Sequence, residues 1–298
     1  MIYEFALEPT LLNSWERFRY LTEKFGVSQG RLISRYPKRW KALVYDALGG
    51  CSEIDKKRIE ERLVRLDDRM MSRTSEWEPA RDWLSNAENE HAKRPFRAIV
   101  AAANPRAKPE VLIADELDEN TPGWIVKREI VVARQAADLA NALSPLLYLA
   151  REIVFVDPHF DPYKPRARAT LREFLVRASS RQNGIQIQRV EFHTSFREGI
   201  AEFDAECQRQ LPQRIPAGIS LRVVRLRERA GGEGFHNRYI LTDRGGVRLA
   251  WGLDEGTVAQ TDDLSLLDDG LFRTRWDQYC GTNPVFDIAG EVTIVGTL

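Results

Sequence analysis

The residue types best suited to chemistry stand close together near position 240, where His236, Arg238 and Asp243 follow one another. Side chains alternate along a strand, so a strand over 235–242 would place His236 and Arg238 on one face. A neutral imidazole can attack phosphorus and carry a phosphoryl group, and a fixed cation beside it holds the non-bridging oxygens. Asp243, at the strand end, could orient a neighbouring imidazole or form an Asx-type turn bond. The spacing therefore predicts a phosphate site in which these residues are the candidate catalytic groups.

Two other histidines, His159 and His193, directly follow predicted strands. Sites in open α/β sheets gather at such strand ends, so either histidine could supply a second imidazole. A role as an ordinary loop residue is the simpler interpretation of each one. The chain has only four histidines, so a site that uses two of them must be assembled by the fold or by two chains.

Arginines and lysines cluster in two segments, although the whole chain is neutral, with 44 basic and 44 acidic side chains. A neutral protein has no bulk field that attracts nucleic acid, so any polyanion must be held by a local patch. If the clustered residues share a face, they could follow a nucleic-acid backbone. The alternative is ordinary solvated arginines paired with acids. The residues concerned are Lys164, Arg166, Arg168 and Arg172, and then Arg222, Arg225, Arg227 and Arg229.

The second half of the chain has the element order that must position these residues. The continuous apolar run 153–156 is typical of a central strand that is buried on both faces. Strands alternate with helices and a hairpin closes the series, which predicts a three-layer α/β sandwich over 124–298. The predicted strands cover 124–132, 153–156, 187–193, 219–226, 235–242 and 247–251, and the predicted helices cover 133–150, 165–179 and 199–211.

The first part of the chain, 1–103, has apolar residues at helical spacing and is predicted to be a mainly helical domain. Its expected helices cover 13–25, 40–48, 52–71 and 79–102. The helix over 52–71 could be a coiled-coil arm, but its pattern is short and better fits a helix packed by one stripe on its own domain. Residues 104–123 contain several prolines and an acidic run at 115–119, and are predicted to be a linker, although 111–113 could be a short strand. The acidic run could mimic nucleic acid, but a solvated loop is the simpler interpretation.

The stretch around His236 resembles the H-x-K-x4-D motif of the phospholipase D superfamily, with Arg238 in place of the lysine. The following Gly252-Leu253-Asp254-Glu255 is similar to the family's G-S-x-N segment at its glycine. The histidine–arginine variant followed by Gly-Leu-Asp is closer to the phospholipase D-like C-terminal domains of MIT-domain proteins, which bind lipids and partners. The resemblance covers about 170 residues and implies a phospholipase D-like fold, with Gly252, Asp254, Glu255, His159 and His193 as candidate substrate-binding residues.

The same resemblance implies a metal-independent phosphodiesterase, most simply a nuclease that acts through a phosphohistidine. Because that mechanism needs two histidines, it implies a homodimer with two copies of His236 facing each other across a twofold axis. The alternative is a degenerate module that binds phosphate-containing ligands or protein partners, for example as a subunit of a bacterial defence assembly. Loss of the lysine and of the Ser and Asn positions favours this second interpretation.

The remaining sequence features exclude several classes of protein. The three cysteines are far apart and show no zinc spacing, which predicts reduced residues in a cytoplasmic protein. No run of apolar residues is long enough for a membrane span, and the start of the chain is not a signal peptide. No nucleotide-binding or metalloprotease motif is present, so no cofactor and no metal is expected. The expected partners are nucleic acid or another phosphodiester, a second copy of the chain, or a larger assembly.

Overall fold

The computed structural model describes residues 1–180, 185–197, 202–281 and 283–298. The chain divides into two compact units, Ile2–Arg128 and Glu129–Leu298, and Met1 is grouped with the second. The boundary therefore lies after the predicted linker. Residues 104–123 belong to the N-terminal unit and contribute a strand to its sheet, because the apolar run 111–113 pairs with a neighbouring strand. The start predicted for the helix over 199–211 lies outside the described residues.

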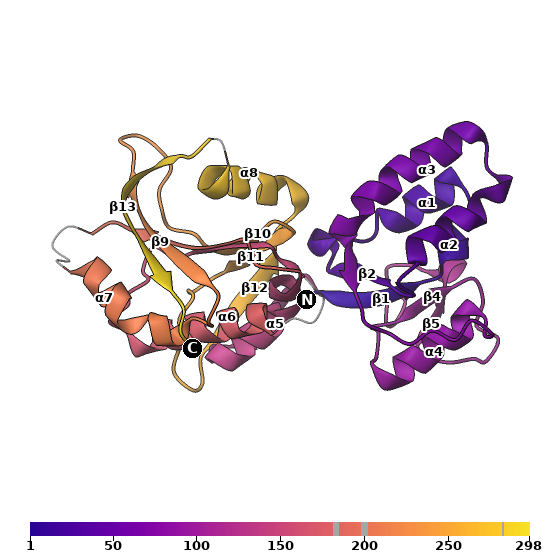
Figure 1. Cartoon of the computed structure of the whole chain (residues 1–298), viewed down its shortest axis with the longest axis horizontal. Helices are drawn as coiled ribbons and strands as arrows, with labels where there is room; N and C mark the ends of the chain where they lie inside the picture. Colours follow the sequence, from indigo (N-terminus) through magenta and orange to yellow (C-terminus); the bar gives the residue numbers. More distant parts are fainter. Residues whose placement is uncertain (181–184, 198–201, 282) are drawn as a thin grey trace. The chain divides into compact units, whose positions relative to one another are not determined.

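The N-terminal unit is built on a five-stranded sheet in the order β3-β2-β1-β4-β5, and every neighbouring pair is parallel. The prediction of a mainly helical domain is therefore wrong, since this unit is α/β (Figure 1). Its strands have three to five residues, too few to show a clear period in the sequence. They are β1 (Tyr3–Leu7), β2 (Arg31–Arg35), β3 (Met70–Ser72), β4 (Ile99–Ala101) and β5 (Val111–Ile113).

Helices cover both faces of this sheet. Ser14 caps α1 (Trp15–Thr22) and Ser52 caps α3 (Glu53–Arg65), as helix N-caps commonly do. Ile59 and Leu63 of α3 are buried in the core of their own unit, so this helix is not a free coiled-coil arm. Ala87 of α4 packs against the opposite face of the sheet. The remaining helix is α2 (Trp40–Asp46), α4 covers Trp83–Lys93, and short 3-10 helices cover Pro9–Leu12, Val27–Gln29, Ala47–Gly50, Leu66–Arg69 and Ala114–Glu116.

The C-terminal unit contains a mixed eight-stranded sheet in the order β13-β9-β8-β7-β10-β11-β12-β6. The three central strands β9, β8 and β7 are parallel to one another, and the other pairs are antiparallel. The strands are β6 (Glu129–Ala133), β7 (Glu152–Val156), β8 (Arg189–Ser195), β9 (Ser220–Glu228), β10 (Arg238–Thr242), β11 (Gly245–Leu249), β12 (Thr261–Leu266) and β13 (Phe286–Val295).

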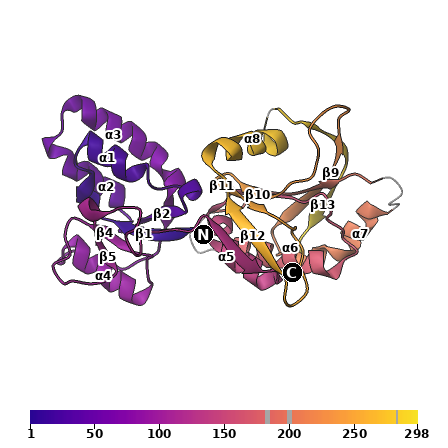
Figure 2. The ribbon, with the colours of Figure 1, turned by 180° about the vertical axis from the view of Figure 1, so that it is seen from behind.

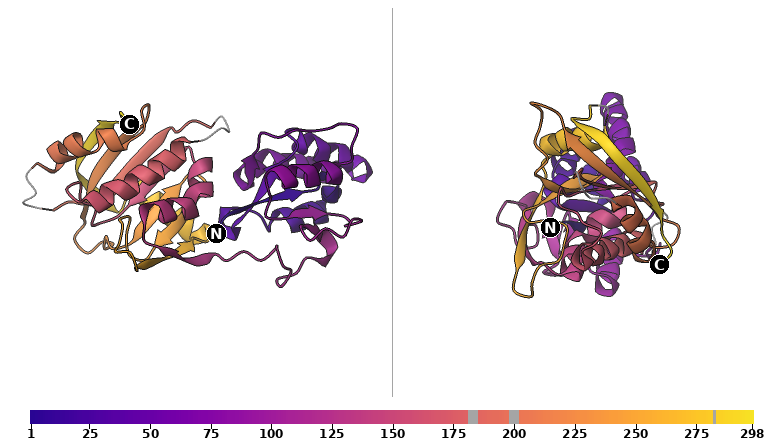
Figure 3. Two further views of the ribbon diagram at one scale, coloured as in Figure 1. Left: turned by 90° about the horizontal axis from the view of Figure 1, so that it is seen from below. Right: turned by 90° about the vertical axis from the view of Figure 1, so that its left-hand side faces the viewer.

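Helices also cover both faces of this second sheet, with α6 and α7 on one side and α8 on the other (Figures 2 and 3). Phe155 of β7 stacks on Phe174 of α6 at a ring distance of 5.6 Å. On the opposite face, Tyr239 of β10 packs against Tyr279 of α8. The predicted helix 165–179 is confirmed as α6, whereas β12, α8 and β13 were not predicted. The helices are α5 (Ala136–Leu149), α6 (Pro165–Ser179), α7 (Phe203–Gln210), α8 (Asp269–Cys280) and a 3-10 helix, Pro212–Arg214.

Candidate phosphate-binding site

The predicted strand around the motif is shorter than expected, because β10 begins at Arg238 and His236 lies in the segment before it. His236 is exposed, and its Nε2 lies 2.8 Å from the position that a Cβ on Gly234 would occupy. The ring therefore folds back over a residue that has no side chain. The expectation that strand alternation places His236 and Arg238 on one face does not hold, since His236 is outside the strand.

Asp243 lies at the far end of β10 from Arg238. One of its carboxylate oxygens, Oδ1, accepts hydrogen bonds from the backbone N–H groups of Arg151 (2.7 Å) and Glu152 (3.1 Å). It therefore holds the start of β7. The motif spans the whole strand, so Asp243 is not placed to orient an imidazole at the end where His236 and Arg238 lie.

Arg238 lies at the carboxyl end of β7, because β10 runs antiparallel to β7 and Tyr239 pairs with Val156. The residue that directly follows β7 is Asp157, which is buried. Both of its carboxylate oxygens accept hydrogen bonds from backbone N–H groups. Its Oδ1 accepts from His159 N–H (2.8 Å), and its Oδ2 accepts from Leu253 N–H (2.8 Å). Asp157 therefore fixes the loop that carries His159 and joins it to the segment after β11.

The exposed side chain of His159 is oriented by an arginine. Nη2 of Arg197 donates to Pro158 O at 3.0 Å and lies 3.4 Å from Nδ1 of His159. A guanidinium cannot accept a hydrogen bond, so Nδ1 is the acceptor and the neutral ring carries its proton on Nε2. Burial lowers the pKa of His159 below its ordinary value of 6.5, and the charge of Arg238 lowers it further. At neutral pH the ring is therefore a neutral donor.

Arg238 has no carboxylate within ion-pairing distance among the residues that the structure describes. Its Nε is buried without a hydrogen-bond partner. Asp157, which directly follows β7, has both carboxylate oxygens bonded to backbone N–H groups. A buried polar group without a partner is costly, and a bound anion would satisfy it. This guanidinium, together with His159 and Arg197, forms what we call the edge cluster.

The predicted substrate-binding residues after β11 hold the loop in place. A Cβ on Gly252 would lie 3.1 Å from Oδ2 of Asp157, so the glycine avoids a tight contact with this carboxylate. Asp254 forms ion pairs with Arg134 and Arg166. Glu255 accepts from the N–H of Ala136 in the first turn of α5 at 3.0 Å. Both carboxylates are therefore engaged within the fold.

His193 does not belong to this site. It was expected just beyond a strand end, but it lies within β8 and is 3% exposed. Its Nε2 is 2.8 Å from Glu191, which also binds Arg222 at 3.0 Å. Burial raises the pKa of Glu191, but the contact with His193, the hydrogen bond from Arg222 and the charge of Arg189 together lower that pKa to about 2. His193 lies beside Tyr279 of α8, on the opposite face of the sheet from Ile240 and Arg238.

The second cluster of basic residues, which the sequence suggested could share one face, is divided between the two faces of β9. Arg222 contacts Glu191 on the α8 side, whereas Arg225 binds Asp204 of α7 at 2.7 Å. Many of the other basic residues are also paired or bound to backbone carbonyls, as Arg166, Arg168 and Arg229 show. The arginines of β9 therefore do not form one continuous surface for a polyanion.

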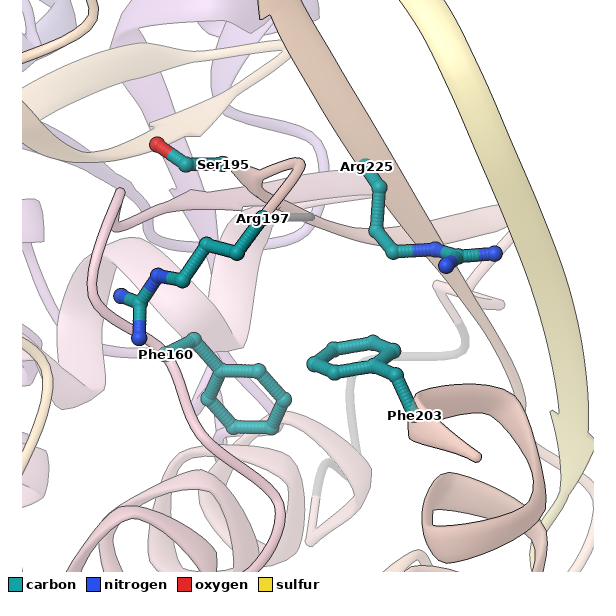
Figure 4. A pocket seen from close by; sticks show the side chains of 5 residues that line it. All are labelled: Phe160, Ser195, Arg197, Phe203 and Arg225. Carbon is teal, nitrogen blue, oxygen red and sulfur yellow. The ribbon is translucent and has the colours of Figure 1, made fainter. Parts of the chain in front are cut away.

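A narrow hollow adjoins the edge cluster and is lined by Phe160, Ser195, Arg197, Phe203 and Arg225 (Figure 4). It has room for little more than a water-sized group. Arg197 reaches back along the loop of Phe160, while the guanidinium of Arg225 points toward β13 (Figure 4). The hollow is therefore too small for a base or a sugar.

Among the described residues, no group of three or more His, Cys, Asp or Glu side chains could hold a metal ion. Two acidic residues near the end of the chain, Asp262 and Asp268, have local roles. Asp262 accepts from the N–H groups of Ala250 and Trp251, and Asp268 caps α8. Throughout the residues that the structure describes, no helix has the length and apolar character needed to cross a membrane.

Sequence reasoning missed both Arg197 and Asp157 as members of the site. Asp157 had a usable signal, since a polar residue directly after a buried parallel strand lies where sites gather. Arg197 had none, because only the pairing of β7 with β8 brings it to His159. The structure unites Arg238, His159 and Gly252, and it separates Asp243 and His193 from them.

No protein-family model matches the chain, and no curated protein matches it. One solved structure with some likeness is that of TrmBL2, an archaeal chromatin protein with a novel mode of DNA binding. The likeness covers 52% of this chain and 52% of that chain, at 13% identity and a TM-score of 0.24. The chain thus spans about half the length of TrmBL2, and a match this low carries no argument about fold or function.

Proposed function

We propose that the C-terminal unit is a phospholipase D-like module that binds the phosphate of a phosphodiester ligand at the edge cluster. The observation that carries this proposal is Arg238, a half-buried guanidinium whose Nε has no hydrogen-bond partner among the described residues. His159 and Arg197 lie in the loops that follow β7 and β8 at the same sheet edge. The helix–sheet–helix layering and the His236-x-Arg238 spacing agree with the resemblance to that superfamily.

The expected binding mode follows from the donors present. The guanidinium of Arg238 would donate to two non-bridging oxygens, and Nε2–H of His159 would donate to one of them. Arg197 adds positive charge without leaving its bond to Pro158 O. No described carboxylate competes for Arg238, so the ligand does not have to displace an ion pair.

Isothermal titration with a phosphodiester, such as dimethyl phosphate or a short oligonucleotide, tests the proposal on the full chain. Arg238→Ala should weaken binding, whereas Arg248→Ala, which removes an exposed arginine on the neighbouring strand β11, should not. Circular dichroism and thermal melting would show that both variants fold. Equal binding by Arg238→Ala and the wild type would overturn the proposal.

Hydrolysis by the same module is a second candidate, and the exposure of His236 favours it. An imidazole that is free of the core could attack phosphorus and form a phosphohistidine while the P–O bond to the leaving group breaks. The departing oxygen would take a proton from a second, protonated imidazole, and water would then release a phosphomonoester from His236 while that imidazole takes the proton back. His236 of a second copy, or His159 of the same chain in its protonated form, could provide that proton, whereas buried His193 is on the wrong face of the sheet.

Labelled DNA and RNA incubated with the protein in EDTA test this second candidate. We expect cleavage that His236→Ala abolishes and that persists without metal. His159→Ala separates the two sources of the proton, because it should abolish cleavage only if the acid lies in the same chain. Absence of cleavage, or equal cleavage by His236→Ala, would exclude a nuclease while leaving the binding proposal intact.

A further inference from the structure

An exposed tryptophan lies at the same end of the β10–β11 hairpin as the motif. Arg238 pairs with Leu249, so His236 precedes β10 by the same two residues by which Trp251 follows β11. Trp251 is 62% exposed. Single exposed apolar residues are common on protein surfaces, so exposure alone carries no function. The way in which this ring is held is what sets it apart.

Trp251 is fixed from two sides. Its backbone N–H donates to Oδ1 of Asp262 at 3.0 Å, and the guanidinium carbon of Arg134 lies 5.3 Å from the ring centroid. The Arg134 side chain is only 7% exposed and is itself held by an ion pair to Asp254. Such a ring loses little conformational freedom when a ligand binds, so it presents a prepared stacking surface.

The segment that carries Trp251 is directly tied to the edge cluster. Leu253, two residues further on, donates to Asp157, and Asp157 also fixes the loop of His159. Asp254 also forms an ion pair with Arg166, which lies in the first turn of α6. Asp157 therefore holds together the loop of the edge cluster and the segment that presents the aromatic ring.

From this arrangement we infer that Trp251 is a stacking platform for a base of a single-stranded nucleic acid. The inference rests on the proposed function, because the phosphate of the same strand would bind at the edge cluster. The hollow lined by Phe160 and Phe203 is too small for a base, so the base stacks on the exposed ring instead. Unpaired bases are required, since bases in a duplex already stack on one another.

A lipid surface is the competing ligand class, and the surroundings of the ring disfavour it. Asp254 and Glu255 follow Trp251 closely, and their carboxylates are occupied by Arg134, Arg166 and Ala136. A bilayer would have to cover these partly exposed polar contacts, whereas a single base needs only the ring.

Fluorescence anisotropy with a short labelled oligodeoxythymidine and an abasic oligomer of the same length tests the inference. Trp251→Ala should weaken binding of oligodeoxythymidine about tenfold, the scale of one stacked base. It should leave the abasic oligomer and the salt dependence unchanged. Trp251→Phe should retain most of the affinity, and Val258→Ala, which changes a 93% exposed residue of the same loop, should bind like the wild type.

Arg238→Ala separates this inference from the function on which it rests. That variant should weaken both oligomers and reduce the slope of log Kd against log salt by about 0.7, as expected for one phosphate contact on a single strand. If Arg238→Ala weakens binding but Trp251→Ala does not, the stacking inference fails and phosphate binding stands. If Arg238→Ala binds both oligomers normally, the proposed function itself fails.

Two other results would overturn the inference. If Trp251→Ala weakens both oligomers equally, the ring supports the phosphate site instead of stacking on a base. If the wild type binds phosphatidylglycerol vesicles and Trp251→Ala loses only that binding, the ring contacts a membrane.

Discussion

Two clusters of histidine and arginine lie in or beside β8, and only one of them includes a carboxylate that pairs with its arginine. His193 and Arg222 lie on the α8 face and share the carboxylate of Glu191. His159, Arg197 and Arg238 lie at the strand ends, where the carboxylate of Asp157 is used by backbone N–H groups. The same residue types therefore complete a buried, neutralised network in one place and leave positive charge available in the other. A free charge, more than the presence of histidine and arginine, distinguishes a binding site from a structural one.

The largest expected effect concerns the neutralised cluster. Glu191→Gln leaves Arg222 without its carboxylate partner and weakens the hydrogen bond to His193, so we expect the free energy of unfolding to fall by about 3 kcal/mol, the scale for a broken buried pair. Urea titration of the variant and the wild type measures the difference. A change confined to ligand binding, with unaltered stability, would show that this cluster is not structural.

The same residue gives an acid dependence with a defined sign. The pKa of Glu191 is lowered from its ordinary value of 4.5 to about 2, so its stabilisation is complete above about pH 4.5 and is lost as the pH falls toward 2. Glu191→Gln should flatten stability against pH in that range. Parallel curves for variant and wild type would contradict this.

Arg238 and Arg222 should show opposite behaviour, with an effect second in size. Loss of a hydrogen bond to a charged group costs about 1.5–3 kcal/mol, so Arg238→Ala should weaken phosphodiester binding about 10–100-fold and leave stability unchanged. Arg222→Ala should reduce stability and leave binding unchanged. Titration calorimetry and thermal melting on the same samples measure binding and stability. If both variants lost binding, or both lost stability, the distinction between the two clusters would be wrong.

A smaller effect extends the comparison to the N-terminal sheet, whose strand order reverses between β1 and β4. Ligands often bind at such a point, but here Glu8 crosses it and accepts from Ala102 N–H at 2.8 Å and from Thr10 at 2.7 Å. Glu8→Ala should cost about 1 kcal/mol of stability and should not change phosphodiester binding. Reduced binding in this variant would show that the N-terminal unit takes part in the site.

The smallest effect is a pH dependence of binding that comes from His159. Its pKa is lowered by burial and by Arg238, so the ring gains a proton only below its ordinary value of 6.5. Because the added charge attracts an anion, binding of a phosphodiester should tighten modestly as the pH falls through that lowered pKa. His159→Ala should bind with no such change. An unaltered pH profile in His159→Ala would assign the titration to another group.

The sequence by itself determined the α/β order of the second half of the chain. Patterns such as the apolar run 153–156 and the helical period over 165–179 predict one local structure, since they depend little on distant residues. The sequence also pointed to Arg238 as part of a phosphate site, and it left His159 open between a second imidazole and an ordinary loop residue. It did not reveal the N-terminal sheet, whose strands of three to five residues are stabilised by parallel neighbours distant in sequence.

Only the tertiary structure decided which residues act together. Asp243 lies at the end of β10 opposite Arg238, where it binds the start of β7. His193 lies within β8 and its side chain faces α8, although the sequence suggested a strand end. The pairing of β7 with β8 and β10 brought Arg197 and Arg238 to His159 from positions about forty and eighty residues away. Whether a charge is neutralised depends on these long-range contacts, so the chain alone names the candidate groups and the fold determines which of them remain free for a ligand.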